Sequence, residues 1–156
     1  MFELPLQIKS EKKTAALACR LAELSKIGDV IYLKGTLGMG KSSFARSFIR
    51  HLSGDPHQEV PSPTFTLVQT YDDLDLPVWH FDLYRLESPE EVEEIGIDEA
   101  LSSAVSLIEW PEHLGRLSFS KTLVICFEPG ADSESRRVVL SSSDSSWEER
   151  LKGFEL

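Results

Sequence analysis

The sequence predicts a single α/β domain over residues 1–156, in which helices flank a mixed central β-sheet. The first support is a short apolar strand, residues 30–33, that leads into a glycine-rich loop and then into helical spacing of apolar side chains. Further strand-like and helix-like segments follow along the rest of the chain. With 41% hydrophobic and 27% charged residues, the composition is that of a globular domain of ordinary size.

The residues around the loop predict an edge strand and two helices. Residues 4–9 alternate apolar and polar side chains, which is typical of an exposed strand. Ser10 is a suitable N-cap for a helix that carries leucines on one face and ends at Gly28. A second helix is expected over residues 43–52, before the breaker cluster at 53–56.

The second half of the chain is expected to hold most of the strands. In chain order they are residues 65–71, 78–84, 105–109, 123–127 and 136–140. The acidic turn at 72–75 predicts that the first two form an antiparallel hairpin. A helix is expected over residues 88–95, with Pro89 in its first turn, and a short closing helix over 147–156.

The glycine-rich loop carries the clearest chemical signal. Residues 35–42 read Gly-Thr-Leu-Gly-Met-Gly-Lys-Ser and match the phosphate-binding pattern G-x-x-x-x-G-K-[ST] at every fixed position. Its glycines let successive backbone N–H groups point at phosphate oxygens. Lys41 is expected to reach the β and γ phosphates, and the Ser42 hydroxyl to ligate Mg²⁺. The fold is therefore expected to be of the P-loop NTPase type; the plainer alternative is a strand-to-helix turn with a solvated lysine.

Three further residues are candidates for phosphate chemistry. Glu109 ends an apolar strand, where ligands gather in α/β sheets, and is the expected second ligand of Mg²⁺, although a strand-end glutamate can also simply face solvent. Asp82 interrupts an apolar strand, so it lies either near the nucleotide or in an ion pair with Arg85. Thr64 lies in a proline-bracketed loop that either approaches the γ-phosphate or forms an ordinary turn. His80 shares the face of Asp82 but is treated as structural.

The net charge and the two cysteines restrict which partners this chain is expected to bind and where it is expected to work. A net charge of −10 argues against this chain alone gripping a nucleic-acid backbone. The acidity gathers in residues 72–75 and 87–99, as a solvated face or as a docking surface for a basic partner. No apolar run has the length of a membrane span. Cys19 and Cys126 are expected to be buried, reduced thiols of a cytosolic protein.

Four motifs in this order resemble the TsaE family (formerly YjeE), small bacterial ATPases of the tRNA threonylcarbamoyladenosine pathway. They are the loop with its following residues, 35–44, and the segments 62–68, 80–86 and 108–112. The likeness covers the chain from about Thr14 to Arg137. The sequence departs from the family at Thr36, where an acid is usual, at Met39, where alanine is usual, and at Ser42, where threonine is more usual.

The resemblance implies ATP and Mg²⁺ as cofactors and assigns roles to particular residues. Lys41 would bind phosphate, Ser42 and Glu109 would hold Mg²⁺, Thr64 would belong to a switch loop, and Asp82 would be needed for hydrolysis. The implied nucleotide contacts are Thr14, Gly38, Met39, Gly40, Lys41, Ser42, Ser43 and a late arginine, taken as Arg137 although Arg136 is an equal candidate.

The resemblance also implies a cellular role. Proteins of this kind work in the cytoplasm with TsaD and TsaB, which attach a threonylcarbamoyl group to the adenosine at position 37 of tRNAs. The ATPase cycle would reset that complex, so the chain would meet tRNA only indirectly and would not meet a membrane.

Two other functions agree with the same loop. One is a small-molecule kinase, although such enzymes need arginines in a lid and only Arg116 lies between Glu109 and the final strands. The other is a nucleotide-gated binding module with negligible turnover. In that module, the acidic segment 88–95 and the loop of Thr64 would form the surface that partners read.

Overall fold

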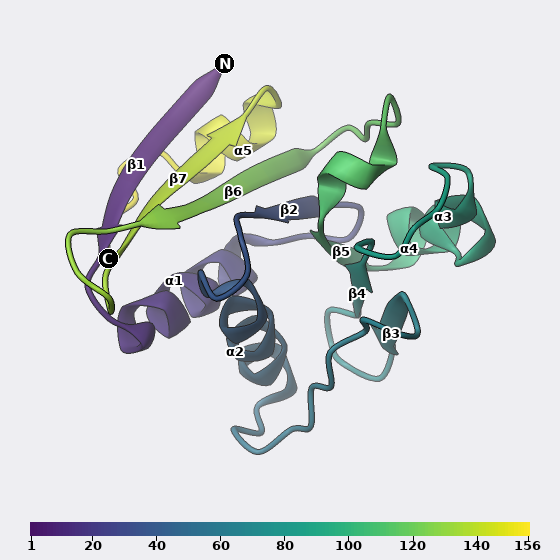
Figure 1. The fold of residues 1–156 in the computed structure, drawn as a ribbon, viewed down its shortest axis with the longest axis horizontal. Coiled ribbons are helices and arrows are strands. Elements are labelled where there is room, and N and C mark those ends of the chain that lie inside the picture. The colour runs from purple at the N-terminus through teal and green to yellow at the C-terminus, as the bar shows by residue number, and fades with distance from the viewer.

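A computed structural model describes residues 1–156, and all of its strands join one seven-stranded sheet (Figure 1). The strands are β1 (Phe2–Ile8), β2 (Val30–Lys34), β3 (Val68–Tyr71), β4 (Val78–Asp82), β5 (Val105–Glu109), β6 (Thr122–Pro129) and β7 (Arg136–Ser142). Their spatial order is β1-β7-β6-β2-β5-β4-β3. The central strands β6, β2, β5 and β4 are parallel, whereas β7, β1 and β3 pair antiparallel at the two sides. The predicted α/β fold with a mixed sheet is confirmed.

The helices lie on both faces of this sheet. They are α1 (Glu11–Leu24), α2 (Lys41–Ser53), α3 (Glu91–Glu94), α4 (Ile97–Ser103), the 3₁₀ helix η1 (Pro111–Leu114) and α5 (Ser145–Arg150). In Figure 1, α1 and α2 pack together on one face, and α3 and α4 lie to the side of β4 and β5. No helix combines the length and the apolar character that crossing a bilayer requires.

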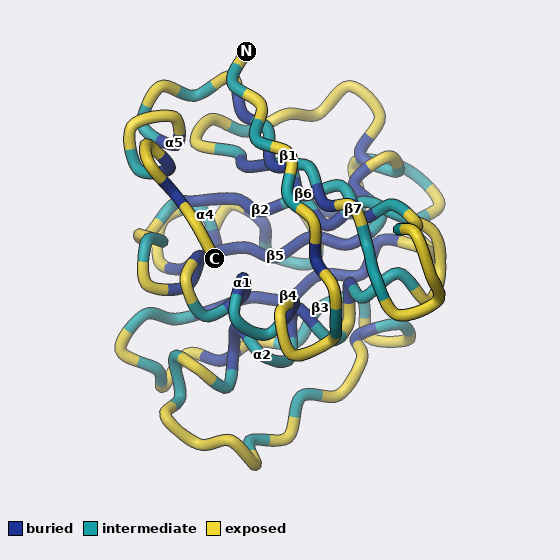
Figure 2. Tube along the Cα trace, turned by 90° about the vertical axis from the view of Figure 1, so that its left-hand side faces the viewer, coloured by how far each residue is buried: buried dark blue, intermediate teal, exposed yellow.

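Two hydrophobic cores correspond to the two faces. The larger core joins α1, α2 and α5 to the sheet through side chains such as Phe44, Phe48 and Trp147. The smaller core joins α3 and α4 to the other face through Phe81 and Ile97. Figure 2 shows the traces of β2 and β5 buried in the middle of the molecule. Burial on both faces explains why these parallel strands are apolar at almost every position.

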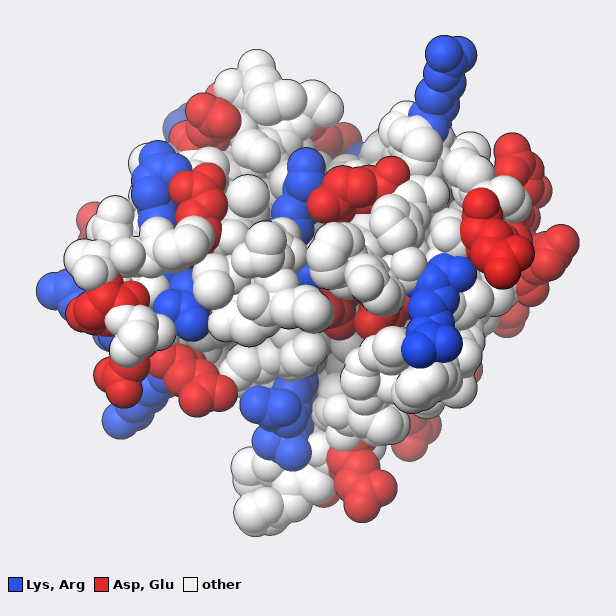
Figure 3. Space-filling model, viewed as in Figure 1, with Lys and Arg blue, Asp and Glu red and all other residues white.

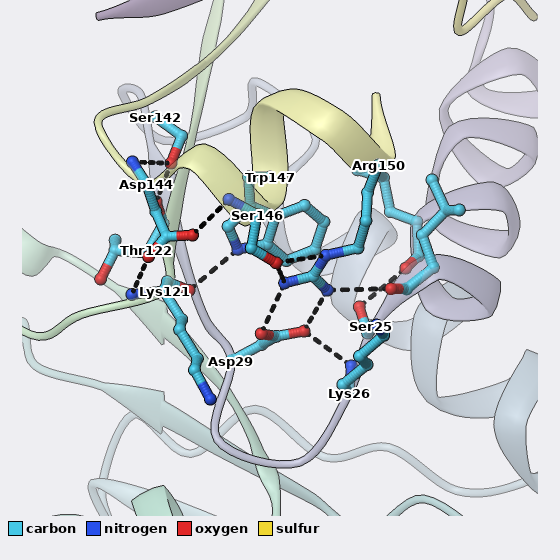
Figure 4. Close-up of polar contacts among 12 residues, drawn as sticks. Ser25, Lys26, Asp29, Lys121, Thr122, Ser142, Asp144, Ser146, Trp147 and Arg150 are labelled. Carbon is cyan, nitrogen blue, oxygen red and sulfur yellow. Dashed lines mark hydrogen bonds and ion pairs between the residues drawn. The ribbon is translucent and has the colours of Figure 1, made fainter. Parts of the chain in front are cut away.

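A buried ion pair fastens α5 beside the start of β2, and we call it the Asp29–Arg150 clamp (Figure 4). The guanidinium of Arg150 donates to both carboxylate oxygens of Asp29, over 2.6 and 3.0 Å. It also lies 3.9 Å from the centre of the Trp147 ring. The backbone N–H of Lys26 and the hydroxyl of Ser146 complete the hydrogen bonding of the pair. Each charged group in the clamp therefore has its partners inside the protein.

Most of the predicted elements are confirmed, and the differences have local causes. Ser10 caps α1 by accepting a hydrogen bond from the N–H of Lys13, and β3 and β4 form the expected antiparallel hairpin. The first strand of that hairpin begins only at Val68, because the preceding residues form a turn in which Leu67 has a φ of 67°. The second strand ends at Asp82, whose carboxylate accepts the N–H of Tyr84.

The acidic helix predicted over residues 88–95 is shorter than expected and is followed by a helix that the sequence analysis missed. Gly96, with a φ of 96°, separates α3 from α4. A Cβ at this position would lie 2.8 Å from the ring of Trp79, so no residue with a Cβ fits here unless the tryptophan shifts. The closing helix predicted over 147–156 begins earlier, at Ser145, because Asp144 provides an N-cap, and it ends at Arg150.

The two cysteines lie in the predicted helix and strand, but they are half-buried rather than buried. They do not form a disulfide. Burial raises the pKa of the Cys19 thiol, and the nearby carboxylate of Glu23 raises it further. This thiol is therefore protonated at neutral pH and reacts slowly.

Candidate functional site

The glycine-rich loop connects the end of β2 to the start of α2, as its pattern predicts. Gly35, Gly38 and Gly40 all have positive φ values, of 140°, 81° and 108°. A Cβ at Gly35 would lie 2.8 Å from the carbonyl oxygen of Phe127, so the loop can pass β6 only because this residue is glycine. The first turn of α2 has no side-chain cap, which leaves its N–H groups available to an anion.

Lys41 is the first residue of α2 and is buried, with 5% of its surface exposed. Its ammonium nitrogen has no hydrogen-bond partner in the protein. The ammonium lies 4.1 Å from the centre of the Trp110 ring, which offers only a cation–π contact. A buried ammonium without an acceptor is costly unless an anionic ligand binds beside it. The Lys41 side chain therefore fits a phosphate group.

A cavity of about 690 Å³ lies over this loop. Only two of its 16 lining residues are hydrophobic, which suits a charged ligand better than an apolar one. The walls come from the start of α1, the loop with the start of α2, the end of β5 and the β6–β7 loop. The lining residues are Ser10, Glu11, Lys12, Thr14, Leu37, Gly38, Met39, Gly40, Lys41, Ser42, Ser43, Arg46, Glu109, Ser133, Glu134 and Arg136.

Two acidic residues end neighbouring strands at the same edge of the sheet. Glu109 ends β5 and Asp82 ends β4, and the two residues are paired in the β4–β5 register. Both are buried, and Glu109 lines the cavity together with Ser42. A hydroxyl and a carboxylate are oxygen ligands of the kind that Mg²⁺ takes beside substrate phosphates and water. No group of three or more His, Cys, Asp or Glu side chains is arranged to hold a metal ion.

His80 contacts Glu109, which the sequence analysis did not anticipate. Its Nε2 atom lies 2.7 Å from Oε2 of Glu109, and both side chains are buried. The other ring nitrogen of His80 has no hydrogen-bond partner. Side chains alternate along a strand, which predicted that His80 shares a face with Asp82. The contact between His80 and Glu109 also requires β4 to pair with β5 in this register.

Thr64 and Asp82 are hydrogen-bonded to each other and lie outside the cavity wall. The Thr64 hydroxyl donates to Oδ2 of Asp82 over 3.2 Å and lies 2.7 Å from the hydroxyl of Ser62. The alternative ion pair between Asp82 and Arg85 does not form, because the guanidinium of Arg85 lies over the ring of Phe65, 4.5 Å from its centre.

The two late arginines point in different directions. Arg136 lines the cavity and donates to the carbonyl oxygen of Gly38 over 3.2 Å. Arg137, the residue chosen from the sequence, instead forms a surface ion pair of 3.1 Å with Glu128. Arg136 and Arg137 are consecutive residues of β7, so their side chains face opposite sides of the sheet. The pairing of β7 with β6 determines which of the two faces the phosphate loop. The structure therefore brings Arg136, and not Arg137, to the phosphate loop.

The cavity wall formed by the β6–β7 loop, which faces the phosphate loop, is held in place by hydrogen bonds to side chains. The carboxylate of Asp132 accepts the backbone N–H groups of Glu134 and Ser135, and these hydrogen bonds lower the pKa of Asp132. Across the cavity, the Ser43 hydroxyl donates to Glu11 over 2.9 Å. Thr14 is buried in the wall formed by the start of α1. The predicted nucleotide contacts Thr14 and Ser43 therefore both line the cavity.

The acidic segment forms a surface away from the cavity. In Figure 3, acidic side chains gather at the right-hand edge of the molecule, where α3 and α4 lie in Figure 1. The exposed acidic residues of α3 and its start are Glu90, Glu93 and Glu94. Basic and acidic side chains are mixed over the rest of this view.

Comparisons with known proteins agree with one another. The family model described as "Threonylcarbamoyl adenosine biosynthesis protein TsaE" matches residues 8–138. A protein of Rickettsia felis named "tRNA threonylcarbamoyladenosine biosynthesis protein TsaE" is 39% identical over 144 residues, which are 90% of this chain and 82% of that protein. The Bacillus subtilis protein of the same name is 35% identical over 135 residues, covering 86% of this chain and 83% of its own length.

A solved structure extends the likeness to the fold. The crystal structure of Bacillus subtilis YdiB superposes with a TM-score of 0.80 at 27% sequence identity. The superposition covers 97% of this chain and 93% of that one.

Proposed function

Because the chain belongs to the TsaE family, we propose that it is an Mg²⁺-dependent ATPase that supports TsaD and TsaB in forming N6-threonylcarbamoyladenosine at position 37 of tRNAs. The family and the relatives are named for threonylcarbamoyladenosine biosynthesis. One observation carries the ATPase part of the proposal. The buried ammonium group of Lys41 has no acceptor within the protein and lies in the wall of a polar cavity.

Nucleotide binding would use the loop and the start of α2. The free N–H groups of the first turn and the positive end of the helix dipole attract phosphate oxygens. Lys41 adds a full charge, and Arg136, which donates to the carbonyl oxygen of Gly38, adds a second beside the loop. The β6–β7 loop and the start of α1, with Thr14, would border the base and ribose.

Ser42 and Glu109 would hold the metal ion through their oxygen atoms. Bound Mg²⁺ neutralises charge on the phosphates and so favours attack at the γ-phosphorus. Ser42 follows Lys41 directly on α2, so phosphate binding and metal binding are fixed by the same helix start.

Asp82 is the residue that would orient the attacking water. Its carboxylate is held by the N–H of Tyr84 and by the Thr64 hydroxyl, and it stands next to Glu109 in the sheet. A carboxylate held by two donors has a fixed direction, which is what positioning a nucleophile requires. Thr64 lies in an exposed loop, so its contact with Asp82 would respond to rearrangement of that loop.

Partner binding would involve the loops beside the cavity. Leu37 and Phe65 are large apolar side chains with 77% and 80% of their surface exposed, and Tyr84 is exposed beside Trp110. Of these, Leu37 lines the cavity, and an exposed apolar side chain at that place suits a surface that a protein partner covers. Docking there would couple the partners to the phosphate loop, which carries Leu37.

The test compares the parent chain with Lys41→Ala and Asp82→Ala by isothermal titration with MgATP and by a phosphate-release assay. We expect Lys41→Ala to abolish ATP binding, and Asp82→Ala to bind ATP and lose hydrolysis. Release of inorganic phosphate, and not labelling of a metabolite, is expected for the parent. Equal hydrolysis by Asp82→Ala and the parent would remove Asp82 from this role.

The pathway assignment needs a separate assay. Formation of N6-threonylcarbamoyladenosine by purified TsaD and TsaB, supplied with tRNA and an activated threonylcarbamoyl donor, should require both the parent chain and ATP over repeated rounds. Modification that proceeds equally without the chain would overturn the assignment.

A further inference from the structure

His80 is a buried histidine whose only polar contact is with the proposed metal ligand Glu109. It lies on β4, where every residue is buried, and only 3% of its side-chain surface is exposed. A polar ring in such a place costs free energy unless its hydrogen bonds compensate. Only one of the two ring nitrogens is bonded, because Nδ1 has no partner. An apolar residue would fill this position at lower cost, so packing alone does not account for histidine.

The contact fixes the direction of the Glu109 carboxylate. A carboxylate only accepts hydrogen bonds, so Nε2 of His80 is the donor to Oε2 over 2.7 Å. The other oxygen, Oε1, accepts no hydrogen bond within the protein, and Glu109 lines the cavity. Ser42 lines the same cavity. One oxygen is therefore tied to the sheet and the other is left for a ligand.

We propose that His80 is a positioning residue for the magnesium site, which orients Glu109 by donating from Nε2 to Oε2. The inference rests on the proposed function and deepens it, because it states what holds the metal ligand in place. Residues that orient a metal ligand typically change metal affinity by roughly 10- to 100-fold when they are lost. His80 does not line the cavity, so it acts only through Glu109.

The test measures how magnesium strengthens nucleotide binding. A fluorescent ATP analogue is titrated into the parent and into His80→Gln, His80→Asn and His80→Leu, first in EDTA and then over a series of Mg²⁺ concentrations. Glutamine can place its amide nitrogen near the position of Nε2, whereas asparagine is too short and leucine has no donor. Thermal unfolding of each variant without nucleotide reports its folding separately.

We expect all four proteins to bind the analogue equally in EDTA, because His80 does not line the cavity and forms no hydrogen bond with Lys41 or the loop. The Mg²⁺ concentration that gives half of the affinity gain should rise roughly 10- to 100-fold in His80→Leu and His80→Asn. It should stay within a few-fold of the parent in His80→Gln. A half-maximal Mg²⁺ concentration that is the same in His80→Asn and the parent would overturn the proposal. The comparison of glutamine with asparagine remains decisive if the leucine variant does not fold.

Two controls separate positioning from general damage to the core. Ser106→Ala alters another buried polar side chain without a partner, one that neighbours Trp79 in the sheet, and should not change the Mg²⁺ response. In a Glu109→Ala background, His80→Asn should have no further effect on that response. An additional loss in that background would contradict action through Glu109. If the parent itself shows no Mg²⁺-dependent binding, the proposed function fails rather than this inference alone.

Discussion

The two ends of β2 differ in how their buried charges are paired. At its start, the Asp29–Arg150 clamp gives each charged group partners within the protein (Figure 4). Past its other end, beyond the phosphate loop, the ammonium of Lys41 is buried without a hydrogen bond. The side chains of Asp29, Arg150 and Lys41 are all largely buried. A buried charge with complete pairing indicates a structural role, whereas a buried charge without a partner indicates a ligand that comes from outside.

The largest expected effect comes from breaking the clamp. Arg150→Ala leaves the carboxylate of Asp29, with 1% of its side-chain surface exposed, without its counter-ion. Removing one partner of a buried ion pair costs about 3–5 kcal/mol, so urea unfolding should show a loss of this size. The matched control is Arg137→Ala, which breaks a pair whose side chains are 45% and 43% exposed. That control should cost about 0–1 kcal/mol, and equal losses in the two variants would refute the structural assignment of the clamp.

The second largest effect is expected on the affinity for ATP and not on the free energy of unfolding. Lys41→Met removes a buried ammonium group that has no acceptor, so the free energy of unfolding should not fall by more than about 1 kcal/mol. ATP affinity should fall by at least about 1.5–3 kcal/mol, because hydrogen bonds from a charged group to phosphate are lost. Urea unfolding and isothermal titration measure the two quantities on one preparation. A variant that loses as much stability as Arg150→Ala would show that Lys41 is structural.

A smaller effect is expected in the phosphate loop itself, where two glycines can be compared. Gly35→Ala combines a φ of 140° with a Cβ that would lie 2.8 Å from the carbonyl oxygen of Phe127, and should cost about 1–3 kcal/mol. Gly38→Ala has a φ of 81° but no atom within 4 Å of the added Cβ, so it should cost about 1 kcal/mol. Thermal unfolding measures both, and a larger loss in Gly38→Ala would show that the approach of Phe127 does not constrain the loop.

The smallest effect concerns the loop that carries Arg136. Backbone hydrogen bonds from Ser135 and Glu134 lower the pKa of Asp132 in the folded protein. The ordering of the loop is therefore fully present above the ordinary Asp pKa of about 3.9, and is lost as the pH falls through the lower folded value. The amide NMR signals of Ser135 and Glu134 should be constant from neutral pH to about pH 5 and should shift only in stronger acid. A shift between neutral pH and pH 5 would contradict this assignment.

The sequence predicted what depends on local spacing. The strand, loop and helix around Lys41 follow from one continuous pattern, and Glu109 was expected at a strand end. The fold class followed from the strand, loop and helix pattern together with the strand-like segments of the second half of the chain. These features need no knowledge of which strands are neighbours.

Features that depend on strand register were not predictable. The contact of His80 with Glu109 requires β4 and β5 to be neighbours in a particular alignment. The choice between Arg136 and Arg137 depends on the alignment of β6 with β7. The stacking of Trp110 on Lys41 depends on a backbone φ of 58° directly after β5. Each of these contacts joins residues that are distant in sequence or depends on an unusual backbone angle.

The most direct test of the difference between the two ends is the stabilisation that MgATP gives to the folded chain. A ligand present at 100 times its Kd stabilises a protein by about 2.7 kcal/mol. We expect a gain of about this size, by urea unfolding, for the parent and for Arg150→Lys, and at most about half of it for Lys41→Met at the same MgATP concentration. The same gain in Lys41→Met, or no gain in the parent, would contradict the assignment of the unpaired end to a triphosphate ligand.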